Sequence, residues 1–232
     1  MDTNQIREIE DCAARAWPPE ISEALDGWRL RYTQGVTRRG NSVSPNHLNS
    51  ALPLAALLEK AEAFYGKQNA PTHFQICPAA LPTGLDAALE QRGYTASAHT
   101  EVQIVPLAEA LEKTTKQISF EIEIADGQSE TWFATYRQSE GFDNHSAAVR
   151  QGIIQRITQP KALTIARLDG QPAAIGLSVY DSNWVGIFCM ATLPDYRRRG
   201  AASAVLHAIA AWGQEQGAHN LYLQVMKNNP PA

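Results

Sequence analysis

The pattern of apolar and polar residues predicts alternating helices and strands along the first hundred residues. Apolar residues recur at helical spacing over 6–16 and again over 53–67. The remaining segments alternate as strands do or resume helical spacing. The predicted strands are GWRLRYTQ (27–34), TRRGNSVSP (37–45), THFQIC (72–77) and HTEVQIVPL (99–107), and the third helix is LDAALEQRGY (85–94).

A polar stretch then interrupts the pattern, and a fresh alternation follows it. The interruption is PLAEALEKTTKQ (106–117), and ISFEIEIA resumes at 118. Beyond it the pattern predicts two helices, three strands, a third helix and a last strand. These are SETWFATYRQSEG (129–141), SAAVRQGIIQRI (146–157), KALTIARL (161–168), PAAIGLSVY (172–180), WVGIFCMAT (184–192), 201–212 and NLYLQVM (220–226). We therefore predict two α/β lobes, residues 1–108 and 118–232, joined by a linker at 109–117.

The two halves share an order of elements. SVSP, a helix and THFQIC in the first half parallel CMATLP, a helix and NLYLQVM in the second. Residue identity between the halves is low, and strand–helix–strand units are common. The pattern therefore favours an internal duplication and a chance similarity about equally. The turns differ, because PNHLNSALP has no counterpart of the arginines and glycine in PDYRRRGAAS.

Composition indicates a globular protein rather than a nucleic-acid or membrane binder. The 232 residues carry a net charge of −4, which opposes general attraction to nucleic acid. The longest apolar stretch, near 201–212, is shorter than the roughly 20 residues that a membrane span needs. Three separated cysteines and an acidic start favour a reducing cytoplasm.

The densest positive charge, Arg197 to Arg199, lies where an apolar helix begins. A helix N-terminus presents unpaired N–H groups and a partial positive charge, so it can bind a phosphate. Gly200 lets the backbone approach an anion closely, and arginines can pair with phosphate oxygens. The alternative is an ordinary solvated turn before a helix.

The segment MATLPDYRRRGAASAVL resembles the acetyl-CoA signature of the GNAT acetyltransferase superfamily. That signature is Gln or Arg, two residues, Gly, one residue, then Gly or Ala. The element order from about Ile118 onward and the final NNPPA also resemble this superfamily. The first half, with GWRLR, TRRGNSV and LDAALEQRGY, resembles the degenerate N-terminal lobe of tandem GNAT proteins. The fold implied is a mixed, mostly antiparallel sheet flanked by helices in each lobe.

The resemblance implies an N-acetyltransferase in which an amine directly attacks acetyl-CoA in a ternary complex. It implies that amides of Met190 and Thr192 pair with the pantetheine arm and thioester, with Met190 serving as oxyanion donor. The pyrophosphate would rest on amides from Arg198 to Ala202, and Asn229 would face the cofactor arm. The expected acetyl-CoA-binding residues are Met190, Ala191, Thr192, Arg197, Arg198, Arg199, Gly200, Ala201, Ala202 and Asn229. No metal is expected.

The sequence departs from the family at the general base. The two positions where members carry a glutamate are Gly186 and Gln224 here, and neither can accept a proton. The catalytic candidates are His145 and Asp143 in a polar stretch, and Cys189 beside the amide-donating position. A solvated histidine and an inert packed cysteine are the ordinary alternatives. We expect deprotonation to rely on water or on another residue.

A second departure concerns the last strands. Family members continue past the asparagine segment with a short helix, a tyrosine acid and a strand pair, whereas this sequence stops at Ala232. We expect that the natural chain continues; otherwise another element must cover the sheet edge.

Two further functions compete with the acetyltransferase: a CoA-binding sensor or scaffold without turnover, and a structural role with a surface arginine turn. The expected acceptor is a small-molecule amine or a peptide amino terminus. It would bind between the lobes, with Glu101 as one candidate lining residue. Sequence does not fix the oligomeric state.

Overall fold

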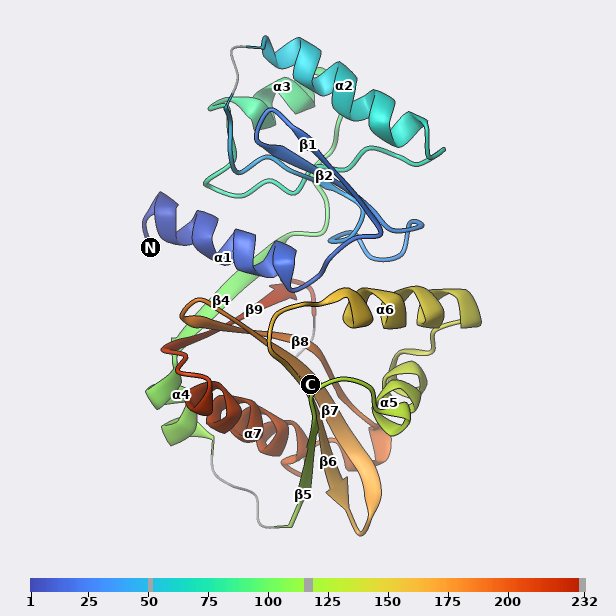
Figure 1. Cartoon of the computed structure of the whole chain (residues 1–232), viewed down its shortest axis with the longest axis vertical. Coiled ribbons are helices and arrows are strands. Elements are labelled where there is room, and N and C mark those ends of the chain that lie inside the picture. The colour runs from blue at the N-terminus through green and yellow to red at the C-terminus, as the bar shows by residue number, and fades with distance from the viewer. Residues whose placement is uncertain (50–51, 115–118, 230–232) are drawn as a thin grey trace. The chain divides into compact units, whose positions relative to one another are not determined.

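The computed structural model describes residues 1–49, 52–114 and 119–229, which form two compact units (Figure 1). Unit 1 comprises Met1–Ser97 and Gly152–Arg156, and unit 2 comprises Ala98–Gln151 and Ile157–Ala232. Both units combine sheet and helix, as the predicted α/β class requires.

Unit 1 holds a three-stranded antiparallel sheet in the order β1-β2-β3. Its elements are α1 (Thr3–Arg15), β1 (Ile21–Leu25), β2 (Trp28–Tyr32), β3 (Val43–Ser44), α2 (Leu54–Gly66) and α3 (Leu85–Gln91). Trp28 and Leu30 pack with Leu57, Phe64 and other apolar residues of α2 into one core. The strand β1 was not predicted, because most of its residues are exposed and give no apolar alternation. The predicted strand 72–77 is wrong apart from one bridge at Phe74.

Unit 2 contains a six-stranded sheet in the order β4-β9-β8-β7-β6-β5. All neighbours are antiparallel except β8 and β9, which are parallel. The elements are β4 (Thr100–Pro106), α4 (Leu107–Lys113), β5 (Glu121–Ala125), α5 (Glu130–Glu140), α6 (Asn144–Arg156), β6 (Lys161–Leu168), β7 (Gln171–Asp181), β8 (Trp184–Thr192), η1 (Pro194–Tyr196), α7 (Ala201–Glu215) and β9 (Asn220–Met226). The end of α6, Gly152–Arg156, is assigned to unit 1. The mixed, mostly antiparallel sheet that we predicted is confirmed.

The strand β4 belongs to unit 2, whereas our prediction gave residues up to 108 to the first lobe. It pairs with β9 along seven residues, from Thr100 opposite Met226 to Pro106 opposite Asn220. The predicted linker 109–117 begins inside α4, and its residues 115–117 lie outside the described part. The polar composition hid this helix, because burying only Leu107 and Ala110 is enough to attach it to the core. Unit 2 therefore begins at Ala98.

The pairing of β4 also decides how the edge of β9 is covered. Cover of that edge by another element was the alternative to our expectation of a longer chain, and β4 occupies the edge. Glu101, expected on the first lobe, lies on β4 with Lys227 at 3.9 Å.

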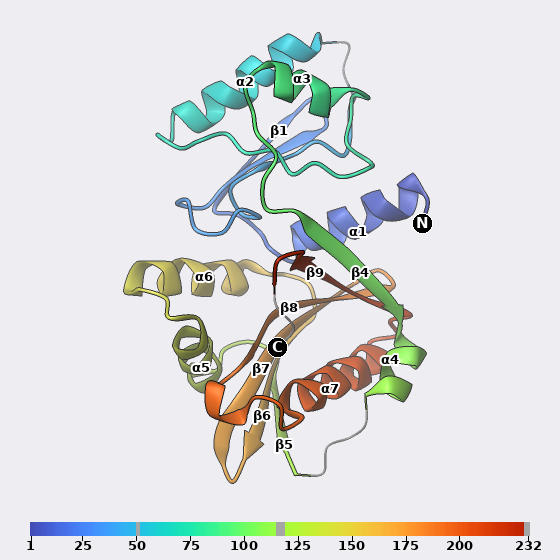
Figure 2. The same ribbon diagram turned by 180° about the vertical axis from the view of Figure 1, so that it is seen from behind.

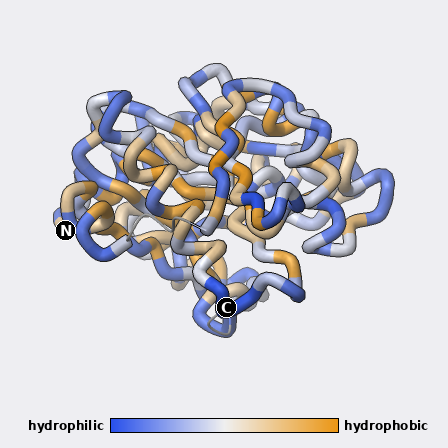
Figure 3. Tube along the Cα trace, turned by 90° about the horizontal axis from the view of Figure 1, so that it is seen from below, coloured by the Kyte–Doolittle hydropathy of each residue, from blue (hydrophilic) through white to orange (hydrophobic). Residues whose placement is uncertain are grey.

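Helices cover both faces of the unit 2 sheet. The helices α4 and α7 lie on one face and α5 lies on the other (Figures 1 and 2). Val205 and Ile209 of α7 pack with Ala174 and Val185 of the sheet and are fully buried. In Figure 3 the hydrophobic positions run mostly through the interior of the trace and the hydrophilic ones mark outer loops. This packing fixes the start of α7 relative to the end of β8.

Each unit contains two parallel β segments separated by a helix. In unit 1, Val43 before α2 pairs in parallel with Phe74 after it. In unit 2, β8 and β9 pair in parallel on either side of α7. The similar element order noted in the sequence thus corresponds to similar local topology.

Candidate functional site

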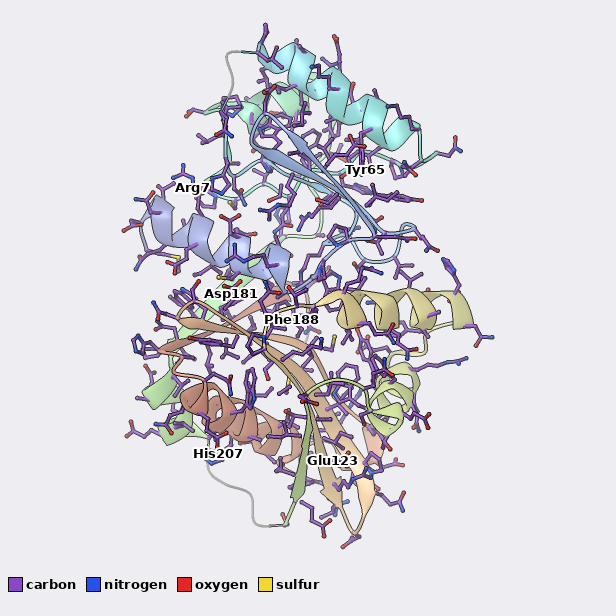
Figure 4. All side chains as sticks on the ribbon, viewed as in Figure 1. Arg7, Tyr65, Glu123, Asp181, Phe188 and His207 are labelled. Atoms are coloured by element: carbon purple, nitrogen blue, oxygen red, sulfur yellow. The ribbon has the colours of Figure 1, made fainter. Side chains whose placement is uncertain are left out.

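The strands β8 and β9 separate halfway along their length. Their parallel pairing runs from Trp184 opposite Asn220 to Ile187 opposite Leu223 and then stops. Beyond that point β8 stays paired with β7 as far as Thr192, and β9 stays paired with β4 as far as Met226. Figure 4 labels Phe188, the first residue of β8 beyond the paired part. No described strand therefore pairs with one backbone edge of residues 188–192.

A β-bulge lies in this separated part of β8. Phe188 pairs with Leu177 and Ala191 with Ile175, so Cys189 and Met190 lie opposite the single residue Gly176. Cys189 has φ of 51°, a left-handed value that non-glycine residues seldom adopt. Bulges of this kind bend a strand and redirect its backbone groups, and they are frequent next to active sites.

Gly176 and Trp132 stabilise the bulge from the facing strand. A Cβ atom on Gly176 would lie 2.7 Å from Met190 Sδ and 2.8 Å from Val205 Cγ1, so only glycine leaves room for the Met190 side chain. The carbonyl of Gly176 accepts a hydrogen bond from Trp132 Nε1 at 3.1 Å. Since Trp132 is fully buried on α5, it holds this helix against the sheet beside the bulge.

Strand alternation gives the direction of the Thr192 amide. The Leu193 N–H donates to Ala173 O on β7 at 2.9 Å. Because successive N–H groups of a strand point to opposite sides, the Thr192 N–H points away from β7. The Thr192 carbonyl accepts from Arg197 Nε at 3.3 Å. Thr192 thus turns its backbone toward the side that β9 has left.

The arginine segment forms a loop between η1 and α7. Arg198 has φ of 57° and Gly200 has φ of 88°, so two left-handed residues turn the chain into the helix. Arg197 contacts Thr192, and the Arg199 guanidinium lies 5.8 Å from the ring centre of Tyr196. Within the described chain, Arg198 makes no hydrogen bond or ion pair.

The first turn of α7 has no side-chain cap. Gly200 is its N-cap and offers no side chain to accept from the amides of the first turn, which contains Ala201 and Ala202. The equivalent helix of unit 1, α2, begins after Pro53 and has neither a nearby glycine nor an arginine. The anion-binding features predicted from the sequence therefore lie together in unit 2, at the end of the unpaired edge of β8.

The family's glutamate position on β8 is filled by an aromatic side chain. A Cβ on Gly186 would lie 2.5 Å from the Tyr222 hydroxyl oxygen and 2.6 Å from Phe188 Cε2. Tyr222 comes from β9 and lies opposite Gly186 in the parallel register. The rings of Phe188 and Tyr222 meet edge to face at 6.1 Å. Gly186 is therefore required for packing. Gln224, at the other position where family members carry a glutamate, lies two residues after Tyr222 on β9.

The three catalytic candidates have different surroundings. Asp143 Oδ1 accepts from the Ser146 N–H at 2.6 Å, so it acts as a cap for α6. These bonds from Ser146 lower the pKa of Asp143, which makes its carboxylate a weaker base. His145 lies exposed in the first turn of α6. Cys189, in the bulge, has the Tyr136 side chain as a hydrogen-bond partner.

The sequence pattern did not reveal a polar cluster on α5 and α6. Burial raises the pKa of Tyr136, with Cys189 acting in the same direction. The Tyr136 hydroxyl also accepts from Arg150 Nη1 at 3.4 Å. The Arg150 guanidinium lies 4.0 Å from the ring centre of Phe142. Helical spacing could have signalled that Tyr136 shares the buried face of Trp132, but it could not have revealed Arg150 beside it.

Asn229 is exposed, and its N–H donates to Met226 O at 2.9 Å. The rest of the proline-alanine segment, 230–232, lies outside the described residues. In the part of the chain that is described, no helix has the length and hydropathy of a membrane span. The same residues contain no group of three or more His, Cys, Asp or Glu side chains able to hold a metal ion.

The chain matches, over residues 3–232, the family described as probable histone acetyltransferase Rv0428c C-terminal. It is 27% identical over 228 residues to the uncharacterized N-acetyltransferase YobR of Bacillus subtilis, covering 97% of this chain and 90% of that protein. It is 24% identical to the probable histone acetyltransferase Rv0428c of Mycobacterium tuberculosis, covering 96% of this chain and 67% of that protein.

Solved structures share the fold at low identity. A GCN5-related N-acetyltransferase from Kribbella flavida has a TM-score of 0.66 at 14% identity, over 94% of this chain and 84% of that one. A tandem GNAT protein from the clavulanic acid biosynthesis pathway has a TM-score of 0.65 at 12% identity, over 96% and 80%.

Proposed function

We propose that this chain, which belongs to the Rv0428c C-terminal family within the GNAT superfamily, is an N-acetyltransferase that moves the acetyl group of acetyl-CoA to an amine. The observation that carries the proposal is the bulged, unpaired edge of β8 followed, after η1 and the arginine loop, by the uncapped start of α7. The names of the relatives support the reaction class, and these two features are where the thioester and the phosphates would bind.

Acetyl-CoA would bind along this edge in unit 2. The pantetheine amides would pair with the Thr192 backbone, whose N–H points away from β7, much as an added strand would. The pyrophosphate would lie at the start of α7, where Ala201 and Ala202 present their amides and Gly200 adds no side chain. Arg198 would supply charge there, since it has no other partner in the described chain.

The reaction is a direct aminolysis of the thioester. The amine nitrogen attacks the acetyl carbonyl carbon, a C–N bond forms, and the C–S bond breaks to release CoA thiolate. The amine proton passes to water, and the thiolate takes up a proton. The Met190 amide would donate to the carbonyl oxygen as negative charge develops, an effect of about 3–4 kcal/mol for single oxyanion donors in other enzymes.

Proton removal would pass through water in this chain. The residues at the family's base positions are Gly186, whose Cβ space is filled by Tyr222, and Gln224. Asp143 is engaged as a helix cap with a lowered pKa, so it is a poor acceptor near neutral pH. Holding amine and thioester together would then provide most of the rate gain.

Titration calorimetry with acetyl-CoA and matched glycine variants tests the binding site. Gly200→Glu places bulk and negative charge at the proposed phosphate site, and we expect acetyl-CoA affinity to fall at least about 100-fold, which corresponds to about 2.7 kcal/mol. Because Gly200 has φ of 88°, the variant also carries backbone strain. Gly170→Glu is the control, since Gly170 has φ of 74° with open space around it and lies in the β6–β7 turn. Equal acetyl-CoA affinity in the two variants would overturn the assignment of the phosphate site to the start of α7.

A CoA-binding sensor without turnover is the second candidate, favoured by the absence of a carboxylate at Gly186 and Gln224. Release of free CoA thiol distinguishes the two. An enzyme releases thiol in proportion to added amine, whereas a sensor binds acetyl-CoA and leaves the thiol assay at background for every amine tested.

A further inference from the structure

Arg150 of α6 is held between two aromatic side chains in unit 2. Its guanidinium carbon lies 4.0 Å from the centre of the Phe142 ring, within the range of a cation–π contact. Its Nη1 reaches the Tyr136 hydroxyl at 3.4 Å, near the limit for a hydrogen bond. The two rings lie 5.0 Å apart and meet edge to face. These contacts fix the position of the guanidinium without neutralising its charge.

The charge of Arg150 has no anionic partner. Among the described residues no carboxylate oxygen lies within 4.0 Å of it, and its Nε is buried without any hydrogen-bond partner. A buried donor left unpaired costs about 1–3 kcal/mol, and more when the group is charged. The Nη2 group makes no hydrogen bond among the described residues either, so a carboxylate would pair with the terminal nitrogens of the guanidinium and not with the buried Nε. Arg150 is thus a cation without an anionic partner in the described part of the chain.

The contacts of Arg150 lead to the proposed point of acetyl transfer. Arg150 bonds to Tyr136, and Tyr136 bonds to the Cys189 side chain. Cys189 is the first residue of the bulge and precedes Met190, the proposed oxyanion donor. The guanidinium is therefore two side-chain contacts away from Cys189, the residue before the proposed oxyanion donor.

The cavity beside the two rings is lined without acidic residues. Tyr136 and Phe142 line this cavity of about 600 Å³ between α5 and α6. Its other lining residues are Phe133, Ala134, Arg137, Gln138, Gly141, Ala147 and Gln151, none of which is acidic. The basic residue in this lining is Arg137, and Arg150 adjoins the cavity through its contacts with Tyr136 and Phe142. An anionic group would therefore find positive charge here, whereas a cationic substrate with several ammonium groups would find no counter-charge.

We propose that Arg150 binds a carboxylate of the acceptor, so that the acceptor is an amine carrying a carboxylate close to its amino group, as in a free amino acid. This inference rests on the proposed acetyl transfer for the identity of the ligand as acceptor. The paired carboxylate neutralises Arg150 and directs the neighbouring amine toward the thioester.

Binding of reaction products tests this without requiring turnover. A panel of N-acetyl amino acids with apolar, polar and acidic side chains is titrated calorimetrically into protein saturated with CoA, beside the corresponding N-acetyl amino acid amides. We expect at least one carboxylate to bind about 10-fold more tightly than its amide, as a charge-assisted pair implies. Arg150→Gln should abolish that difference and Arg150→Lys should retain part of it.

Arg167→Gln is the matched control, because Arg167 lies in the same unit outside this cavity and already pairs with Glu123 Oε2 at 2.7 Å. It should leave the preference intact. Unchanged acetyl-CoA affinity in Arg150→Gln shows that the variant is folded. If Arg150→Gln does not fold, the comparison of acids with amides is made on Arg150→Lys instead. Equal binding of acids and amides across the panel, no binding of any carboxylate, or a preference that survives Arg150→Gln overturns the proposal.

The amine-dependent thiol assay separates this proposal from the proposed function. If carboxylates bind through Arg150 but no amino acid releases thiol, the anion site stands and acetyl transfer fails. If amines without a carboxylate release thiol and carboxylates do not bind, acetyl transfer stands and the role of Arg150 fails.

Discussion

Replacing Gly186 by alanine tests whether aromatic packing excludes a side chain from the family's glutamate position. The new Cβ would lie 2.5 Å from the Tyr222 hydroxyl oxygen, 2.6 Å from Tyr222 Cζ and 2.6 Å from Phe188 Cε2. Ordinary contacts between carbon atoms lie at about 3.5–4.0 Å, so both rings must move by about 1 Å. Phe188 and Tyr222 are 5% and 2% exposed, which leaves them little free space to move into.

The expected cost follows from these contacts. Overpacking a buried site by one methyl group costs about 1–3 kcal/mol, and two rigid rings favour the upper end. Alanine recovers about 0.4–1 kcal/mol by restricting the unfolded chain. We therefore expect Gly186→Ala to lower the free energy of unfolding by about 2 kcal/mol.

The assay is urea unfolding followed by circular dichroism, with Gly127→Ala as control. Gly127 has no atom within 4 Å of the position that an alanine methyl group would occupy, and it lies in the same unit. Its variant should therefore stay within about 0.5 kcal/mol of the original chain. If Gly186→Ala is as stable as Gly127→Ala, the position is not closed by Tyr222. A glutamate there would then be admissible, and its absence would need another reason.

Three further changes probe the bulge, the phosphate loop and the start of α6. Trp132→Phe removes the bond to Gly176 O and leaves a buried carbonyl unpaired, so urea unfolding should show a loss of about 1–3 kcal/mol; no loss would mean that water replaces the indole. Arg198→Ala and Arg198→Gly should weaken acetyl-CoA binding equally in calorimetry, and only the glycine variant should gain stability, since Arg198 has φ of 57°. A larger affinity loss in the alanine variant would mean that the loop conformation, not the charge, matters. The folded pKa of Asp143 is lowered, so its stabilising effect is present above the ordinary value of 3.8 and is lost as pH falls through the folded pKa. Asp143→Asn should therefore flatten the acid limb of the stability profile while leaving the pH dependence of kcat/KM near neutrality unchanged; a shift of that profile would make Asp143 a base.

The sequence predicted the elements that carry a strong local pattern. The helix from Ala201, the strand WVGIFCMAT and the turn at Gly200 were found because apolar periodicity and a glycine mark them in a short window. The resemblance to GNAT proteins then gave the fold and the candidate amides. The bulge geometry at Cys189 could not be predicted in this way, because it depends on Gly176 and Trp132, which are far away in sequence.

Long-range pairing also explains the misplaced boundary. The strand 99–107 was recognised, but its partner β9 lies more than a hundred residues later, and local composition pointed to a linker after it rather than before it. The Tyr136–Arg150 cluster was missed for a similar reason. Each residue is ordinary on its own helix, and only the packing of α5 on α6 leaves the guanidinium without an anionic partner.

The most direct test of the account is acetyl-CoA titration into the intact chain with backbone amide exchange measured in parallel. The account predicts saturable binding with exchange slowed at Met190, Thr192, Ala201 and Ala202, and no slowing at the corresponding start of α2. Binding without protection of these amides, or no binding at all, would contradict the assignment of the β8 edge and the α7 start as the acetyl-CoA site.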